Sequence, residues 1–127
     1  MRELTEQFIS ALHQLHADSD ATALVALFSA DATLTKLGDH NEAHGADGAE
    51  KFWQDYRAVF ADIEATFTHT TADESTVALE WTSTGSLANG HPLSYSGVSV
   101  LEGDGEQISG FRTYYDSAAF LGEGQIA

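Results

Sequence analysis

The sequence predicts a single α+β domain, in which an antiparallel sheet packs one of its faces against helices. Three helical patterns occupy the first half of the chain, and alternating polar and apolar runs follow from about residue 63. The 127 residues suit one compact domain covering 1–127, since no repeat, linker or low-complexity segment divides them. Helices first and strands afterwards are typical of this class.

Apolar residues recur on one helical face between Leu4 and Leu15 and predict the first helix, which should end at the run Ala-Asp-Ser-Asp. Asp20 is placed to cap a short second helix. The buried stripe of that second helix is expected to comprise Leu24, Leu27 and Phe28. The alternation of residues 32–37 then predicts a short strand, and a loop follows from Gly38 to Gly45.

The third helix is expected to start at Asp47, because Glu50 three residues later completes an acidic form of the capping box. Its apolar stripe is predicted to consist of Phe52, Tyr56, Val59, Phe60 and Ile63. Beyond it, turn signals at residues 73–74, 89–90 and 103–105 separate runs rich in Thr and Val. These runs predict four strands.

Charge and composition narrow the possible partners. Twenty acidic residues against five basic ones give a formal charge of −15, so neither nucleic acid nor an anionic membrane is an expected partner. The acids are spread evenly, as in proteins of salt-loving microbes, and high salt should therefore stabilise the chain by screening. There is no cysteine, and neither a signal core nor a membrane-spanning run is visible, so we expect a soluble, cytoplasmic protein.

Four segments resemble the SnoaL-like group, which includes polyketide cyclases, within the nuclear transport factor 2-like superfamily of cystatin-like fold. They are residues 26–33, 44–53, 80–85 and 105–116, in the family's order and across most of the chain. The resemblance implies a cone-shaped curved sheet wrapped around the N-terminal helices, a mostly apolar pocket inside the cone, and a homodimer.

The resemblance also implies that the usual catalytic acid is missing. Polyketide cyclases and limonene epoxide hydrolase carry an Asp directly after an Arg in the last strand, whereas here Thr113 follows Arg112. Alternation puts Thr113 on one strand face with Phe111 and Tyr115, and it puts Asp116 on the other. Trp81 and Ser83 stand where limonene epoxide hydrolase needs an Arg and an Asp.

Ketosteroid isomerase, another member of the superfamily, needs three further groups that this chain lacks. The position of its base aligns with Lys36, its helix-one Tyr with Ala11 or Leu12, and its later Asp with Ser96 or Gly97. Steroid isomerisation by that mechanism is therefore not expected.

Lys36 is the sharpest remaining candidate, because a desolvated ammonium there would hold an acidic ligand or act as a base. The alternative is an ordinary exposed lysine at a strand end. His40 and His44 have the spacing of helical metal ligands, but they lie in a predicted loop, and no metal site or cofactor is expected. His13 and His16 flank the first helical stripe and are expected to be surface groups or satisfied groups at the edge of the core, not catalysts.

Three functions stay open. The first is a pocket for a small hydrophobic or cyclic metabolite, the second a proton-transfer enzyme of the cyclase or isomerase class that uses Lys36, Tyr115 or a pocket histidine, and the third a non-catalytic dimerising module. The residues expected to line the pocket are Lys36, Trp53, Tyr56, Trp81, Ser83, Phe111, Thr113 and Tyr115.

Overall fold

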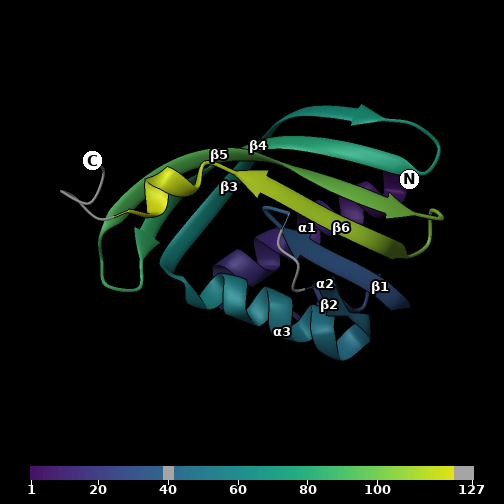
Figure 1. The fold of residues 1–127 in the computed structure, drawn as a ribbon, viewed down its shortest axis with the longest axis horizontal. Helices are drawn as coiled ribbons and strands as arrows, with labels where there is room; N and C mark the ends of the chain where they lie inside the picture. Colours follow the sequence, from purple (N-terminus) through teal and green to yellow (C-terminus); the bar gives the residue numbers. More distant parts are fainter. Residues whose placement is uncertain (39–41, 122–127) are drawn as a thin grey trace.

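The computed structural model describes residues 1–38 and 42–121, and within them helices pack inside one curved sheet (Figure 1). The helices are α1 (Arg2–Asp18), α2 (Thr22–Val25) and α3 (Gly45–Ala58), with a final 3-10 turn η1 (Ser117–Phe120). The strands are β1 (Phe28–Lys36), β2 (Ala43–His44), β3 (Phe60–Ala72), β4 (Thr76–Leu87), β5 (Pro92–Gly103) and β6 (Ile108–Tyr115). This arrangement confirms the predicted α+β class and the four strands that follow the third helix.

The six strands form one sheet in the order β2-β1-β6-β5-β4-β3. The sheet is open, with β2 and β3 at its two edges, and it curves over α1 and α3 as a cone (Figure 1). The expectation of a purely antiparallel sheet is corrected at one pair, because β1 runs parallel to β6. That pairing sets Lys36 opposite Thr113, which brings two candidate residues to neighbouring positions.

The core lies between the concave face of the sheet and the helices. The apolar face of α1 is fully buried at Leu4, Phe8 and Leu15, and α3 contributes Ala49 and Trp53. Burying each such leucine or phenylalanine contributes about 1.5–3 kcal/mol relative to leaving it exposed. This packing against the sheet holds α1 and α3 in place as one wall of the cone.

The second helix is shorter than its sequence stripe predicts. It ends at Val25, and Phe28 is the first residue of β1, so the predicted start of that strand at residue 32 was four residues too late. The backbone N–H of Ile108 donates to the carbonyl of Leu27 at 2.7 Å. This bond lies beside the pairing of Phe28 with Ile108 and so joins the start of β1 to β6. The Asp20 carboxylate accepts from the backbone N–H of Thr22 at 2.9 Å, but the N-cap residue of this helix is Ala21, so the predicted cap at Asp20 was one residue too early.

The third helix begins earlier and ends earlier than predicted. It starts at Gly45 after His44, without a side-chain cap, so the predicted capping box at Asp47 was wrong. Gly45 has a φ of 70°, which lets the chain turn sharply from β2 into α3.

The helix ends at Ala58, and the predicted stripe residues Phe60 and Ile63 belong to β3. A register shift between Phe60 and Asp62, as at a β-bulge, allows Phe60 and Ile63 to be buried in the same cluster three residues apart. A bulged strand thus produced the spacing that is typical of a helix.

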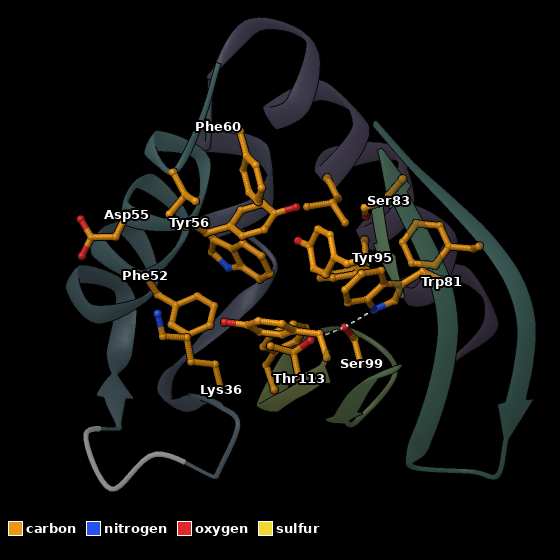
Figure 2. Close-up of a pocket in the computed structure, with 18 of the residues that line it drawn as sticks. Lys36, Phe52, Asp55, Tyr56, Phe60, Trp81, Ser83, Tyr95, Ser99 and Thr113 are labelled. Atoms are coloured by element: carbon orange, nitrogen blue, oxygen red, sulfur yellow. Dashed lines mark hydrogen bonds between the residues drawn. The ribbon is translucent and has the colours of Figure 1, made fainter. Parts of the chain in front are cut away.

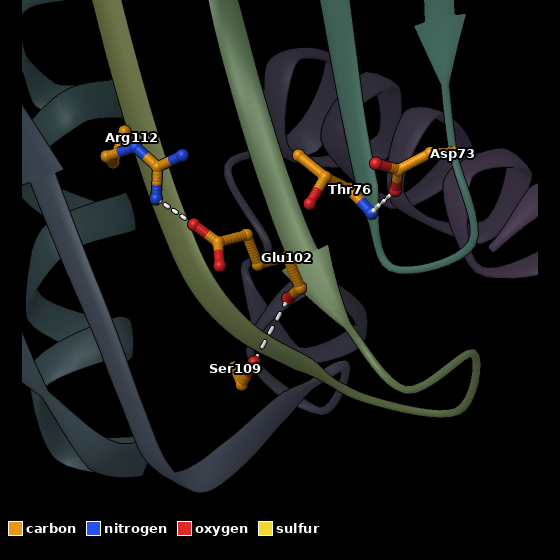
Figure 3. A network of polar contacts seen from close by, with 5 residues as sticks. All are labelled: Asp73, Thr76, Glu102, Ser109 and Arg112. Atoms are coloured by element: carbon orange, nitrogen blue, oxygen red, sulfur yellow. Dashed lines mark hydrogen bonds and ion pairs between the residues drawn. The ribbon is translucent and has the colours of Figure 1, made fainter.

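The outer face of the sheet is polar. Arg112 on β6 forms an ion pair with Glu102 on β5, and the hydroxyl of Ser109 donates to the carbonyl of Glu102 at 3.3 Å (Figure 3). At the β3–β4 turn, the Asp73 carboxylate accepts from the backbone N–H of Thr76 at 2.8 Å (Figure 3). Arg112 therefore lies on the outer face of the sheet and not in the interior of the cone.

Candidate functional site

A cavity of about 190 Å³ lies inside the cone, between the concave face of the sheet and helices α1 and α3 (Figure 2). Its walls are mostly apolar and aromatic. The structure brings together around it all eight residues that the sequence singled out: Lys36, Trp53, Tyr56, Trp81, Ser83, Phe111, Thr113 and Tyr115.

Strand alternation explains why these side chains meet. Phe111, Thr113 and Tyr115 share the inner face of β6, as predicted, while Tyr114 is exposed on the outer face. Ser83 on the inner face of β4 is buried, with an exposed fraction of only 2%. Alternation in β4 and β6 thus supplies the sheet side of the cavity.

Gly97 makes room for the Trp81 indole at the cavity wall. The two residues are cross-strand partners, and a Cβ placed on Gly97 would lie 2.7 Å from the Trp81 ring. Only glycine allows so close an approach without a shift of the ring or the backbone. Of the two positions that align with the later acid of ketosteroid isomerase, Ser96 or Gly97, the second is therefore held by a residue needed for packing.

A chain of hydrogen bonds crosses the inner face of the sheet. The Trp81 indole N–H donates to the Ser99 hydroxyl at 2.9 Å, and Ser99 lies 2.9 Å from the Thr113 hydroxyl (Figure 2). The Thr113 hydroxyl donates to the carbonyl of Val98 at 3.5 Å. If the Ser99 hydroxyl donates to Thr113, the Trp81 N–H and both hydroxyl protons are all donated to acceptors within the protein. Thr113 thus takes part in a self-contained network and has no ionisable group to offer.

Lys36 and Asp55 line the edge of the cavity, and both side chains are exposed. In Figure 2 the Asp55 carboxylate points away from the cavity, and it pairs with Lys51 at 2.5 Å on the surface of α3. The Lys36 side chain extends beside Phe52 (Figure 2). An exposed ammonium is not desolvated, so the structure does not provide the buried lysine that the sequence hypothesis required.

Three tyrosines contribute to the wall. Burial raises the pKa of Tyr56, Tyr95 and Tyr115 above the ordinary value for a phenol. These hydroxyls therefore stay protonated at neutral pH and act as hydrogen-bond donors or acceptors. This argues against Tyr115 as a general base.

His16 on α1 is buried behind the cavity, and its Nε2 lies 2.7 Å from the Tyr56 hydroxyl. Burial, together with the nearby His13 and Arg57, lowers the pKa of His16 to about 4. Its imidazole is therefore neutral at pH 7. The prediction for His16, a surface group or a satisfied group at the edge of the core, did not include this partner, since nothing in the sequence pairs residue 16 with residue 56.

The histidines that the structure describes do not converge on a metal site. His40 and its neighbour Asp39 lie outside the described residues, while His44 is exposed on β2. His13 lies 3.3 Å from the carbonyl of Ala65 through its Nε2. Within residues 1–38 and 42–121, no group of three or more potential His or carboxylate ligands gathers.

Eleven lining residues were absent from the predicted set, among them Phe60, Tyr95, Ser99 and Phe120. Tyr95 and Phe60 belong to a second buried cluster together with Ile63 and Leu93. Ser99 is recognisable only from the register that pairs it with Thr113. Phe120 reaches the cavity from η1, where a short turn gives no periodic signal.

The chain belongs to the SnoaL-like domain family, whose model matches residues 5–111. This confirms the family expected from the four sequence segments. No curated protein matches the chain significantly.

Solved structures of the same fold superpose closely. An NTF2-like protein from Anabaena variabilis ATCC 29413 has a TM-score of 0.83 at 20% identity, over 93% of this chain and 90% of that one. A Catenulispora acidiphila protein with a ketosteroid isomerase-like fold, solved in complex with trimethylamine, has a TM-score of 0.78 at 20% identity, over 91% and 89%. An LEH-like epoxide hydrolase of M. tuberculosis has a TM-score of 0.71 at 19% identity, over 92% and 83%. At these identities the likeness establishes the fold.

In the part of the chain that the structure describes, no helix combines the length and the apolar character needed to cross a membrane.

Proposed function

We propose that this protein binds a small, uncharged, ring-containing molecule inside the cone. The observation that carries the proposal is the cavity of about 190 Å³, whose wall is mostly aromatic and whose polar groups are uncharged, apart from Lys36 and Asp55 at its edge. Ligand pockets are typically apolar with a few oriented polar groups.

The cavity volume limits the ligand's size. An apolar cavity of about 150 Å³ holds benzene. A volume of about 190 Å³ therefore suits one six-membered ring with a few substituent atoms, whereas a four-ring steroid would need the walls to move.

The lining also limits the ligand's charge. Among the described lining residues, Lys36 and Asp55 carry charge, and both are exposed at the edge. A carboxylate placed inside would lose its hydration without gaining a buried cation, which costs several kcal/mol. The net charge of −15 disfavours anions further.

The test is calorimetric titration with a panel that varies size and charge. We expect p-cresol and cyclohexanone to bind with a Kd on the order of 0.1 mM, a typical affinity for ligands of seven or eight heavy atoms. Benzoate and a four-ring steroid should bind at least about 10-fold more weakly. Equal binding of benzoate, or binding of the steroid alone, would overturn the proposal.

A matched pair of variants locates the binding. Ser83→Leu adds volume at a buried inner position of β4, while Thr84→Leu makes a similar change at the next, exposed position. The first should weaken p-cresol binding about 10-fold or more by filling the cavity, and the second should leave it within about twofold. Similar effects of both variants would place the ligand elsewhere.

A further inference from the structure

The contact between His16 and Tyr56 is the second polar feature at the cavity, and it differs from the Trp81–Ser99–Thr113 chain in having an unused proton. His16 approaches Tyr56 through Nε2, and its Nδ1 is buried without a hydrogen-bond partner in the described structure. A neutral imidazole carries one proton, so the position of that proton decides what the Tyr56 hydroxyl can do.

The hydrogen-bond pattern assigns the proton to Nε2. If Nδ1 carried it, a buried N–H would remain unpaired, which costs about 1–3 kcal/mol. If Nε2 carries it, His16 donates to the Tyr56 oxygen, and Nδ1 keeps only an unpaired acceptor lone pair, the more tolerable of the two defects. The Tyr56 proton is then not used by His16.

In this tautomer the hydroxyl proton of Tyr56 has no acceptor among the described residues. Among residues 1–38 and 42–121, His16 is the hydrogen-bond partner of the Tyr56 hydroxyl. Figure 2 shows the hydroxyl groups of Tyr56 and Tyr95 both directed toward the middle of the cavity. By contrast, the Trp53 indole N–H is also unpaired but has almost no accessible surface, so it does not meet a ligand.

We infer that the Tyr56 hydroxyl, oriented by neutral His16, donates a hydrogen bond to the oxygen of the bound ligand, which is an uncharged cyclic ketone or a similar neutral carbonyl compound. This rests on the proposed binding of a small ring in the cavity. Tyr56 holds the ligand, and His16 is a positioning residue. Burial raises the pKa of Tyr56, which keeps the proton on the phenol for donation.

The experiment compares cyclohexanone with methylenecyclohexane, which has nearly the same shape and no oxygen acceptor. In Tyr56→Phe, cyclohexanone should bind about 3- to 10-fold more weakly, as expected for the loss of one neutral hydrogen bond. Binding of methylenecyclohexane should stay within about twofold. Tyr114→Phe, on the exposed outer face of β6, is the control and should change neither ligand.

Two His16 variants test the positioning. Gln can still donate an N–H toward residue 56 and should keep most of the ketone binding, whereas His16→Leu should lose it to the same extent as Tyr56→Phe. The infrared C=O stretch of bound cyclohexanone should lie at lower frequency in the native protein than in Tyr56→Phe, because a donated hydrogen bond weakens the carbonyl bond. A purely structural role for Tyr56 would not move this band.

The outcomes separate the two proposals. If methylenecyclohexane binds and Tyr56→Phe weakens both compounds equally, or leaves the carbonyl band unshifted, the hydrogen-bond inference is wrong while the pocket proposal stands. If neither compound binds the native protein, the pocket proposal fails and the inference fails with it.

Discussion

At the scale of single residues, Thr113 is held by hydrogen bonds on the inner face of β6. The resemblance to cyclases and hydrolases puts an acid at this position, and here a hydroxyl bonds to Ser99 and the carbonyl of Val98 instead. The ionisable groups at the cavity edge, Lys36 and Asp55, are exposed. At the scale of single residues, the site is suited to holding a neutral molecule.

His16 should make the stability of the protein depend on pH. In the folded protein its pKa is about 4, while its ordinary value of 6.5 applies after unfolding. Between these values the unfolded chain binds the extra proton, so the free energy of unfolding falls as pH drops from 6.5 to 4. The loss is at most about 3 kcal/mol and is complete below pH 4.

Urea denaturation of the native protein and of His16→Gln, from pH 7.5 to 4.5, measures this contribution. Gln does not titrate, and the carboxylates are common to both proteins, so the difference between the two pH profiles isolates His16. The native protein should lose stability relative to the variant as pH falls. Parallel profiles would show that His16 is not held neutral by the fold.

At the scale of elements, the short turn η1 closes one end of the cavity. The Asp116 carboxylate accepts from the backbone N–H of Ala118 at 3.1 Å and fixes the turn. Phe120 at its end packs against Tyr95 and Tyr115, with ring centroids 4.8 Å and 5.5 Å away. Asp116 therefore faces away from the cavity, as its alternation predicted, but still contributes to its enclosure.

Removing this closure should speed ligand release. Phe120→Ala would take about 40–50 Å² of apolar contact from a bound ring, worth about 1 kcal/mol, so 4-bromophenol should dissociate about fivefold faster. Stopped-flow tryptophan fluorescence follows the release, because Trp53 and Trp81 line the cavity. Leu121→Ala, at an exposed neighbouring position, is the control, and an equal effect there would mean that η1 is no closure.

The faces of β6 could be predicted from the sequence, whereas the end of α3 and the contacts between helices could not. The alternation of β6 predicted its inner and outer faces, because a strand has a fixed period of two. The end of α3 was misjudged because a register irregularity near Phe60 imitates helical spacing. Contacts such as His16 with Tyr56 join residues 40 positions apart, and only the packing of α1 against α3 brings them together.

At the scale of the whole molecule, the segments shared with the SnoaL-like family predicted the cone, and the cone in turn predicted which strand faces look inward. All eight expected lining residues meet at one cavity, while Ser99 and Phe120 needed the register and the terminal turn to be known. The size of the cavity could not be predicted, since it depends on how tightly aromatic rings such as Trp53 and Phe111, 4.9 Å apart, pack together.

The most direct test of the proposed pocket is a crystal structure of the protein grown with 4-bromophenol, in which anomalous scattering locates the bromine. We expect one strong peak inside the cone, within contact of Trp81, Phe60 or Phe111, with the phenol oxygen near Tyr56. An empty cavity with bromine only on the outer surface would contradict it.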